Sequence, residues 1–335
     1  FNLFHKMDSV QPKVNFPNPV CSLCGKESQK VVFENVYKNN QAYDVIECLS
    51  CQVWFTHPIP STEELSKLYS TGNYRAKTGK RFIPILEKII HFLTMRKRNR
   101  IKKYMAGGRI LDIGCGRGLF LNLMKKDGWL VAGQEFDEKS ASYAVDNYGI
   151  DVHTGSLQGK FESESFDVVN INHVLEHLEN PEKIIAECNR ILKRGGLLVI
   201  AVPNIDSLQA KFGERKWFQL DIPCHLYHFS SSSIVKLIES NFFKVDLVRH
   251  FKLEYNPFGW LQTMLNVLGI HENHLYDMLK SSELKSNEKG NFPLSDNIKS
   301  FFLVPLCLPL SFIFSIIEAM FKKGGTVEIY SLKNN

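Results

Sequence analysis

The stretch from Arg109 to Asp137 constrains the fold of this chain more than any other part of its sequence. A short apolar run is followed by three glycines, a helical pattern from Leu119 to Lys126, and a second apolar run that ends near Glu135. Glycines let a ligand approach the backbone, the helix start offers free N–H groups, and an acid after the second strand can accept ribose hydroxyls. The sequence therefore predicts strand, turn, helix and strand, with a nucleotide-type ligand at the turn.

The spacing of the glycines narrows the kind of ligand. A dinucleotide fold would place a third glycine at position 119, but that residue is Leu119, so the motif reads G-x-G-x-G and is preceded by Asp112. This motif resembles the first motif of the class I S-adenosylmethionine-dependent methyltransferases. The alternative is a plain Rossmann-like turn that binds another nucleotide.

A second stretch, residues 166–204, carries the same resemblance from the expected fourth strand through the fifth. The resemblance implies an α/β fold: a Rossmann-like seven-stranded sheet with helices on both faces, in which the last two strands form an antiparallel edge. The expected strands are Arg109–Ile113, Leu130–Gly133, Val152–Gly155, Phe166–Ile171, Leu197–Val202, Phe243–Phe251 and Gly325–Leu332.

The resemblance also implies where the methyl donor, S-adenosylmethionine, binds. The implied donor-binding residues are Asp112, Gly114, Cys115, Gly116, Gly118, Glu135, Phe136, Ser156, Leu157, Asn172 and His173. The thiols of Cys115, Cys188, Cys224 and Cys307 are expected to pack as small apolar groups.

Two C-x-x-C pairs near the N-terminus predict one structural zinc ion. The four cysteines are Cys21, Cys24, Cys48 and Cys51, and a strand-like segment, Val31–Tyr43, lies between the pairs. Four thiolates suit tetrahedral zinc, and so small a domain lacks the core to fold without a metal. A redox dithiol is the alternative, but it would need only one pair. Since all four ligands come from the protein, the site is expected to be structural.

Histidines and one acid near two strand ends are the candidate catalytic residues. His173, Glu176 and His177 follow the fourth strand, where ligands of open α/β sheets bind, and His225 and His228 lie on a later loop. A histidine can take a proton from a hydroxyl acceptor, with Glu176 orienting it. Some quinone-biosynthesis O-methyltransferases bind a metal at this point through an acid, an acid and a histidine. The corresponding residues here are His173, Glu176 and His177, so the first acid is replaced by histidine. Helix capping, donor positioning and loop closure are the structural alternatives.

The chain divides into five expected parts. They are a tail (1–17), a zinc ribbon (18–60), a helical linker (61–105), the methyltransferase core (106–251 with 324–335) and a helical insertion (252–323). Within the linker, Ser61 and Glu64 predict a capping box. The linker resembles that of zinc-ribbon methyltransferases of type 11/23 from sugar and cell-surface glycan biosynthesis. Tyr69 and Tyr74 stand at that family's paired tyrosines and would either contact a ligand or pack on the core.

The run from Phe301 to Phe321 is close in length to a membrane span, and its hydropathy alone would predict one. The strand expected after it must rejoin the sheet, and Pro305 and Pro309 are expected to break a straight helix. Two interpretations remain: a helical lid buried against the core, which we favour, or a segment that dips into one leaflet. In the second case Lys322, Lys323 and the basic segment 96–103 would lie near anionic headgroups.

These features favour an enzyme that methylates oxygen or carbon of a small or glycan-type acceptor. A nucleic-acid methyltransferase is the alternative, because some ribosomal RNA enzymes join a zinc ribbon to this fold and the basic segment would suit RNA. The amino-methylating variety would show Pro-Pro and an aromatic residue after the fourth strand, where this chain reads Asn-His-Val-Leu. An inactive donor-binding scaffold is disfavoured by the intact first motif. The net charge of +6 is modest, and the paired cysteines and polar N-terminus favour the cytoplasm, with contact to the inner membrane face if 301–321 inserts. The oligomeric state stays open.

Overall fold

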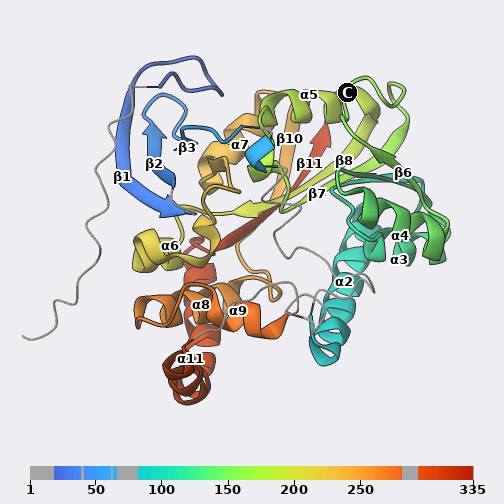
Figure 1. The fold of residues 1–335 in the computed structure, drawn as a ribbon. Helices are drawn as coiled ribbons and strands as arrows, with labels where there is room; N and C mark the ends of the chain where they lie inside the picture. Colours follow the sequence, from blue (N-terminus) through green and yellow to red (C-terminus); the bar gives the residue numbers. More distant parts are fainter. Residues whose placement is uncertain (1–18, 39–40, 62, 66–81, 281–292, 335) are drawn as a thin grey trace, which may run out of the picture.

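The computed structural model describes residues 19–38, 41–61, 63–65, 82–280 and 293–334. Their strands form a seven-stranded sheet in the order β10-β11-β8-β7-β4-β5-β6 and a four-stranded sheet in the order β1-β2-β3-β9. Figure 1 shows the four-stranded sheet beside the larger one, with helices α8, α9 and α11 grouped below both. The predicted tail and the tyrosines Tyr69 and Tyr74 lie outside the described residues.

The seven-stranded sheet confirms the predicted fold class. Strands β4 to β8 are parallel to one another, and β11 is antiparallel to both β8 and β10. The first expected strand is observed with its predicted bounds, whereas β8 begins five residues early and β10 ends two residues early. The strands are β4 (Arg109–Ile113), β5 (Leu130–Glu135), β6 (Asp151–Thr154), β7 (Phe166–Asn172), β8 (Leu192–Pro203), β10 (Phe243–Arg249) and β11 (Thr326–Lys333).

Helices cover both faces of this sheet because its buried strands are apolar on both sides. Ile110 of β4 packs in one cluster with Leu121, whereas its neighbour Leu111 packs on the opposite face with Ile185. The first face carries α2 (Pro84–Tyr104), α3 (Leu119–Lys126) and α4 (Glu138–Tyr148), and the second carries α5 (Pro181–Ile191) and α7 (Ser231–Glu239). Shorter helical segments are η1 (Leu175–His177), α6 (Leu208–Gly213), η2 (Glu214–Lys216) and η3 (Phe218–Leu220).

The four-stranded sheet joins the ribbon to the core. Its ribbon strands are β1 (Gln29–Lys38), β2 (Gln41–Cys48) and β3 (Trp54–His57), and its fourth strand, β9 (Tyr227–His228), comes from the core. The segment expected to be strand-like, Val31–Tyr43, contains most of β1 and the first residues of β2, and these two strands pair antiparallel. The predicted capping box is present, since the Ser61 amide donates to Glu64 Oε2 at 2.7 Å and the Glu64 amide to Ser61 Oγ at 3.2 Å.

The insertion between β10 and β11 is helical in its described parts, with α8 (Asn256–Val267), α9 (His274–Leu279) and α11 (Leu294–Met320). Two expectations for α11 were wrong. Pro305 and Pro309 lie inside one continuous helix, and the helix is not a buried lid, because only 22% of its most apolar 18-residue window is buried. Of the described helices, α11 alone is long and apolar enough to cross a membrane.

The basic segment at the end of α2 is largely engaged inside the protein. Lys102 and Arg98 contact Asp127 at 2.9 Å and 3.5 Å, and Arg100 contacts the buried Glu328 at 2.8 Å. Lys97 is buried and lies over the ring of Phe120. The segment is therefore mainly a packing element rather than a free basic face.

Candidate active site

Three glycines in the left-handed region shape the turn between β4 and α3. Gly114, Gly116 and Gly118 have φ angles of 68°, 57° and 72°, which side chains disfavour. The Gly114 amide donates to the Gln134 carbonyl at 2.8 Å. A Cβ on Gly114 would lie 2.3 Å from Cγ2 of Val174, so the turn directly abuts the segment after β7.

Two acids flank this turn. Glu135 Oε2 accepts a hydrogen bond of 2.8 Å from the Gly116 amide, and Glu135 Oε1 accepts one of 3.1 Å from the Asp137 amide. Asp112 accepts a hydrogen bond from the Asn170 side chain, and burial raises the pKa of Asp112 to about 6. Both acids therefore lie at the turn where the sequence predicts the donor.

The remaining predicted donor residues differ in what they can offer. The ring of Phe136 is 61% exposed directly after Glu135 and can stack on a base. Leu157 and Cys115 have buried side chains, so they can face a ligand mainly through their backbone. Ser156 is exposed, and its hydroxyl accepts a hydrogen bond of 3.3 Å from the Gln158 amide.

Asn172 and His173, at the end of β7, contact a segment that sequence reasoning missed. Asn172 donates to the Tyr255 hydroxyl at 3.0 Å and accepts from Lys252 Nζ at 2.8 Å. The ring of His173 stacks on that of Tyr255 with centroids 4.0 Å apart, and the φ of His173 is 53°. Lys252 and Tyr255 follow β10, so they reach the site from the carboxyl end of a parallel-running strand. A charged residue just after a strand was the available signal.

Glu328, which sequence reasoning also missed, is the common partner of three cations near the site. It is fully buried in β11 and is paired with Arg100 at 2.8 Å, Arg249 at 3.1 Å and Lys252 at 3.0 Å. The signal in the sequence was an acid inside an apolar strand, which implies buried cationic partners.

The four predicted catalytic residues come together at the same edge of the sheet. Glu176 and His177 lie in η1, whereas His225 and His228 lie on the segment before α7. Nε2 of His225 is 4.0 Å from Oε1 of Glu176, and the rings of His177 and His225 are 4.6 Å apart between centroids. His173 adds a fourth imidazole, with Nδ1 3.4 Å from Oε1 of Glu176.

Backbone carbonyls fix the tautomers of two of these histidines. Nδ1 of His225 lies 2.9 Å from the Gln219 carbonyl oxygen, and Nδ1 of His177 lies 2.9 Å from the Cys224 carbonyl oxygen. Because a carbonyl only accepts, each Nδ1 carries the hydrogen and each neutral ring keeps its lone pair on Nε2. Both Nε2 atoms can thus act as a proton acceptor or a metal ligand.

The cluster is electrostatically unusual. Burial lowers the pKa of His173 and of His177, and it lowers that of His228 to about 3, so these rings are neutral at pH 7. Burial also raises the pKa of Glu176, but the imidazole of His173, with Nδ1 3.4 Å from Oε1, lowers it more strongly. Neither Glu176 oxygen has a hydrogen-bond partner among the described residues. A buried carboxylate in this state is costly and is typical of functional sites.

A metal ion is the second chemical option at this cluster. The ligand atoms of Glu176, His177 and His225 all lie within 4.8 Å of one another, and two histidines with one carboxylate can bind a divalent metal. His173, which the sequence placed first in a metal set, is not one of the three.

The four ribbon cysteines have the geometry of a zinc site. Sγ of Cys21 lies 3.8 Å from that of Cys51, and Sγ of Cys24 lies 3.5 Å from that of Cys48. These separations match the edges of about 3.8 Å expected for a zinc tetrahedron with Zn–S bonds of about 2.3 Å. All four cysteines are free thiols rather than disulfides. The donor set therefore fits zinc.

The ribbon holds the loop that carries His225 and His228. In the ladder between β3 and β9, His228 lies opposite Trp54. The hydroxyl of Thr56 donates to the His225 carbonyl at 2.7 Å, and the hydroxyl of Ser22 lies 2.7 Å from that of Tyr227. The N-terminal ribbon therefore holds the histidine loop in place.

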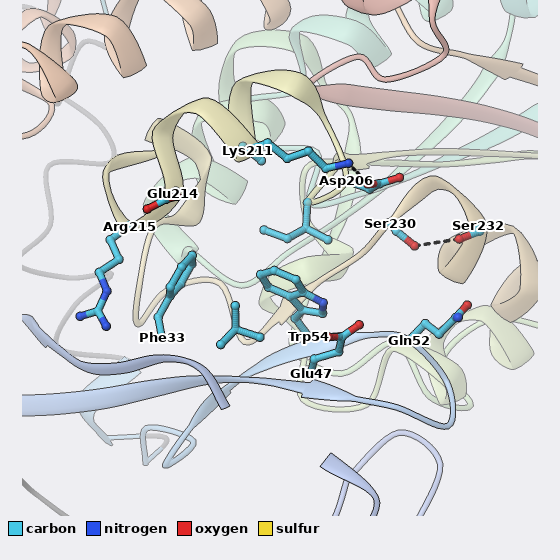
Figure 2. Close-up of a pocket in the computed structure, with 13 residues that line it drawn as sticks. Phe33, Glu47, Gln52, Trp54, Asp206, Lys211, Glu214, Arg215, Ser230 and Ser232 are labelled. Carbon is cyan, nitrogen blue, oxygen red and sulfur yellow. Dashed lines mark hydrogen bonds and ion pairs between the residues drawn. The ribbon is translucent and has the colours of Figure 1, made fainter. Parts of the chain in front are cut away.

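A cleft of about 800 Å³ opens between the ribbon and the α6 region. Figure 2 shows the rings of Phe33 and Trp54 facing it from the ribbon, with Lys211 and Asp206 on the opposite wall. Lys211 and Asp206 are 2.7 Å apart. Aromatic surfaces beside fixed charges suit a polar ligand with apolar faces. None of the predicted donor-binding residues lines this cleft.

Comparison with known proteins identifies the central part of the chain. Residues 85–248 match a family described as a methyltransferase domain. An uncharacterized protein of Methanocaldococcus jannaschii is 31% identical over 145 residues, which cover 43% of this chain and 68% of that protein. A probable S-adenosylmethionine-dependent methyltransferase of Mycolicibacterium smegmatis is 27% identical over 173 residues, or 50% of this chain and 65% of that protein.

Two further similarities are narrower, one in the length that it covers and the other in sequence identity. A ubiquinone biosynthesis O-methyltransferase of Maricaulis maris is 40% identical over 105 residues, 29% of this chain and 41% of that protein. The chain thus spans less than two thirds of the M. smegmatis and M. maris proteins. The match to the crystal structure of a [4+2]-cyclase, SpnF, covers 82% of this chain and 97% of the cyclase, with a TM-score of 0.50. The two sequences are 14% identical, so this similarity shows a shared fold alone.

Proposed function

We propose that this chain, which belongs to the S-adenosylmethionine-dependent methyltransferases, methylates a hydroxyl oxygen or an activated carbon of a small or glycan-type acceptor. The observation that carries the proposal is the buried Glu176, with no hydrogen-bond partner in the described chain, beside the Nε2 lone pair of His225. This pair lies next to the glycine turn, because Gly114 abuts Val174.

On the donor side, the turn after β4 would hold S-adenosylmethionine, which supplies an electrophilic methyl group on its sulfonium. The left-handed glycines let a ligand come close to the backbone, and Glu135 would accept the ribose hydroxyls. Because methyl transfer is an in-line displacement, the main task of these residues is to align the two reactants.

On the acceptor side, His225 would take the proton through Nε2 as the new bond to the methyl group forms and the carbon–sulfur bond breaks. The positive charge that then appears on the imidazole lies 4.0 Å from the carboxylate of Glu176. A carboxylate already buried beside that position needs no reorganisation to stabilise the charge. His177, with the same tautomer and with its ring 4.6 Å from that of His225, is the second candidate for the proton.

The cleft beside the ribbon supports a glycan-type acceptor. Trp54 and Phe33 offer flat apolar faces of the kind that sugar rings cover, and Asp206, Lys211 and Arg215 offer polar contacts. Trp54 of the cleft lies opposite His228 in the β-ladder, although Glu176 and the histidines of the cluster do not themselves line the cleft. The similarity to an O-methyltransferase supports oxygen as the target atom.

Nucleic acid is the less favoured acceptor. Lys97, Arg98, Arg100 and Lys102 are engaged within the protein, which leaves little of the basic segment for phosphates. The eight free cysteines support a reducing cytoplasm as the compartment.

The proposal is tested with radiolabelled S-adenosylmethionine and two acceptor panels, nucleotide-linked sugars and ribosomal RNA. We expect label in the first panel only, and His225→Asn or His177→Asn should reduce turnover about 10²- to 10⁴-fold while donor binding is unchanged. His91→Asn, an exposed change on α2, is the control. Full turnover in both variants, or label in RNA alone, would overturn the proposal.

Metal analysis separates the proton acceptor from the metal option. One zinc per chain is expected, from the ribbon. A second equivalent that Glu176→Gln removes would make the cluster a metal site and contradict the role of a free histidine base.

A further inference from the structure

Helix α11 is apolar on its outside and polar on its inside. Its buried residues are Asp296, Ser300, Cys307, Ser311, Ser315 and Glu318. Its large apolar side chains are instead mostly exposed, and they include Phe301, Phe302, Leu306, Ile313, Ile316 and Met320. A helix on the surface of a water-soluble protein has the opposite arrangement, with its apolar stripe facing the core.

The inner side of α11 combines an apolar contact with satisfied polar groups. Leu303, Val304 and Phe314 are partly buried against the cluster around Trp260 of α8, with the rings of Phe314 and Trp260 5.1 Å apart between centroids. The hydroxyls of Ser311 and Ser315 donate to carbonyls of their own helix, at 2.6 Å and 2.7 Å. Glu318 accepts hydrogen bonds of 3.0 Å from Gln209, Asn256 and the Gly325 amide. Small polar residues between helices with apolar residues outside are typical of helices in lipid.

A second apolar surface belongs to the first half of α2. Ile85, Ile89 and Phe92 are exposed there. The start of α2 is tied to the insertion, since the Ile83 amide donates to the Leu279 carbonyl at 3.1 Å. Figure 1 shows α2 and the α8, α9 and α11 group extending from the same side of the large sheet.

This side is the edge of the sheet that carries the candidate active site. Strand β11 is antiparallel to β8 and begins directly after α11, so α11 meets the sheet where β8 ends. Lys252 and Tyr255, between β10 and α8, contact Asn172 at the same edge. The apolar surface and the site therefore face the same way.

We infer that α11 and the first half of α2 insert into one leaflet of a lipid bilayer. At 100° per residue the exposed apolar positions of α11 cover an arc of about 200°, wider than the stripe of about 100° that one packed face requires. A second copy of the chain would cover one such face, whereas lipid can surround the whole arc.

The helix lies in the leaflet rather than crossing the bilayer. Its length of about 40 Å, from a rise of about 1.5 Å per residue, exceeds the hydrocarbon core. Near its first turn, however, Asp296 accepts a hydrogen bond of 3.2 Å from the His271 amide, and near its end Glu318 is bonded to Asn256 at the start of α8. Both ends are thus held by the same protein body, which fits an interfacial helix.

Apolar area rather than charge drives this insertion. Half of the cations expected to face the headgroups are paired with acids of the protein: Arg98 and Lys102 with Asp127, Arg100 with Glu328, and Lys323 with Asp206. Lys97 is buried, which leaves Arg96, Lys103 and Lys322 exposed. Binding should therefore occur on neutral vesicles and persist in salt.

Flotation of the full chain with phosphatidylcholine vesicles in high salt tests the inference. The wild type should float, and a variant with Phe301→Ser and Phe302→Ser should bind at least about tenfold more weakly. The matched control is Phe242→Ser, an equally exposed ring (73%, against 74% for Phe301) outside the inferred lipid-facing helices.

Three results would overturn the inference. The first is a wild type that stays at the bottom with both neutral and anionic vesicles, above all if light scattering shows a dimer that the double substitution dissociates. The second is flotation with anionic vesicles only, lost in salt. The third is an equal loss in the Phe242 control. Flotation measures only whether the protein binds vesicles. A protein that does not float can still transfer methyl groups, so this result does not contradict the proposed function.

Discussion

The hydroxyl of Thr56 donates a hydrogen bond of 2.7 Å to the carbonyl of His225, and so ties the N-terminal cysteine ribbon to the candidate proton acceptor. Beside it, His228 pairs with Trp54 in the ladder of the ribbon sheet. The ribbon is thus more than a separate N-terminal module, because the histidine loop completes its sheet.

Removing zinc should therefore loosen the histidine loop. Chelation, or Cys48→Ser, leaves β2 and β3 without their metal, and the residues around 221–230 should then exchange their amide hydrogens faster. Hydrogen exchange with mass spectrometry measures this, and protein reloaded with zinc is the control. Freshly purified protein without zinc, or a loop whose exchange rate does not change, would contradict the claim that the metal-bound ribbon holds this loop in place.

Gly114→Ala should weaken donor binding and destabilise the fold by about 1–3 kcal/mol. The new Cβ would lie 2.3 Å from Val174 at a φ of 68°, so both the contact and the backbone are unfavourable. Gly107→Ala is the matched control, because its Cβ would meet nothing within 4 Å. Thermal unfolding and calorimetry of the two variants should differ clearly, and equal behaviour would argue against a tightly built turn.

Glu328→Gln should destabilise the protein by about 3–5 kcal/mol at pH 7, because three cations lose their buried partner. Burial raises the pKa of Glu328, but Lys252 and Arg100 outweigh it and bring the value to about 2, against 4.5 as the ordinary value. Because the folded pKa is the lower one, the contribution is present above pH 4.5 and is lost as the pH falls towards 2.

Urea unfolding across this pH range measures the effect. The difference in free energy of unfolding between wild type and Glu328→Gln should shrink between pH 4.5 and 2, while that for the exposed Glu239→Gln should stay small. A difference that does not depend on pH would contradict the low pKa of Glu328.

Local patterns predicted most of the large sheet. Its central strands β4, β7 and β8 contain apolar runs next to turn signals, and Gly114, Gly116 and Glu135 form a motif whose spacing sets its geometry. The histidines were found for the same reason, since ligands bind where parallel strands end. The contact between His225 and Glu176 depends on tertiary packing of two distant segments, so it cannot be predicted from local sequence patterns.

The errors have physical causes. Lys252 and Glu328 carry only weak sequence signals, and they become part of the site when the insertion and β11 fold beside it. In water, proline usually breaks a helix and apolar residues usually face the core. Helix α11 instead continues through Pro305 and Pro309 and exposes its apolar side.

Calorimetric titration of the protein with S-adenosylmethionine tests the central claim most directly. The wild type should bind saturably, and Glu135→Ala should bind at least about tenfold more weakly, because a carboxylate bonded to ribose hydroxyls contributes roughly 1.5–3 kcal/mol. Glu138→Ala, three residues further on at the exposed start of α4, should bind like the wild type. Absence of binding by the wild type, or equal affinity in the Glu135 and Glu138 variants, would contradict the account.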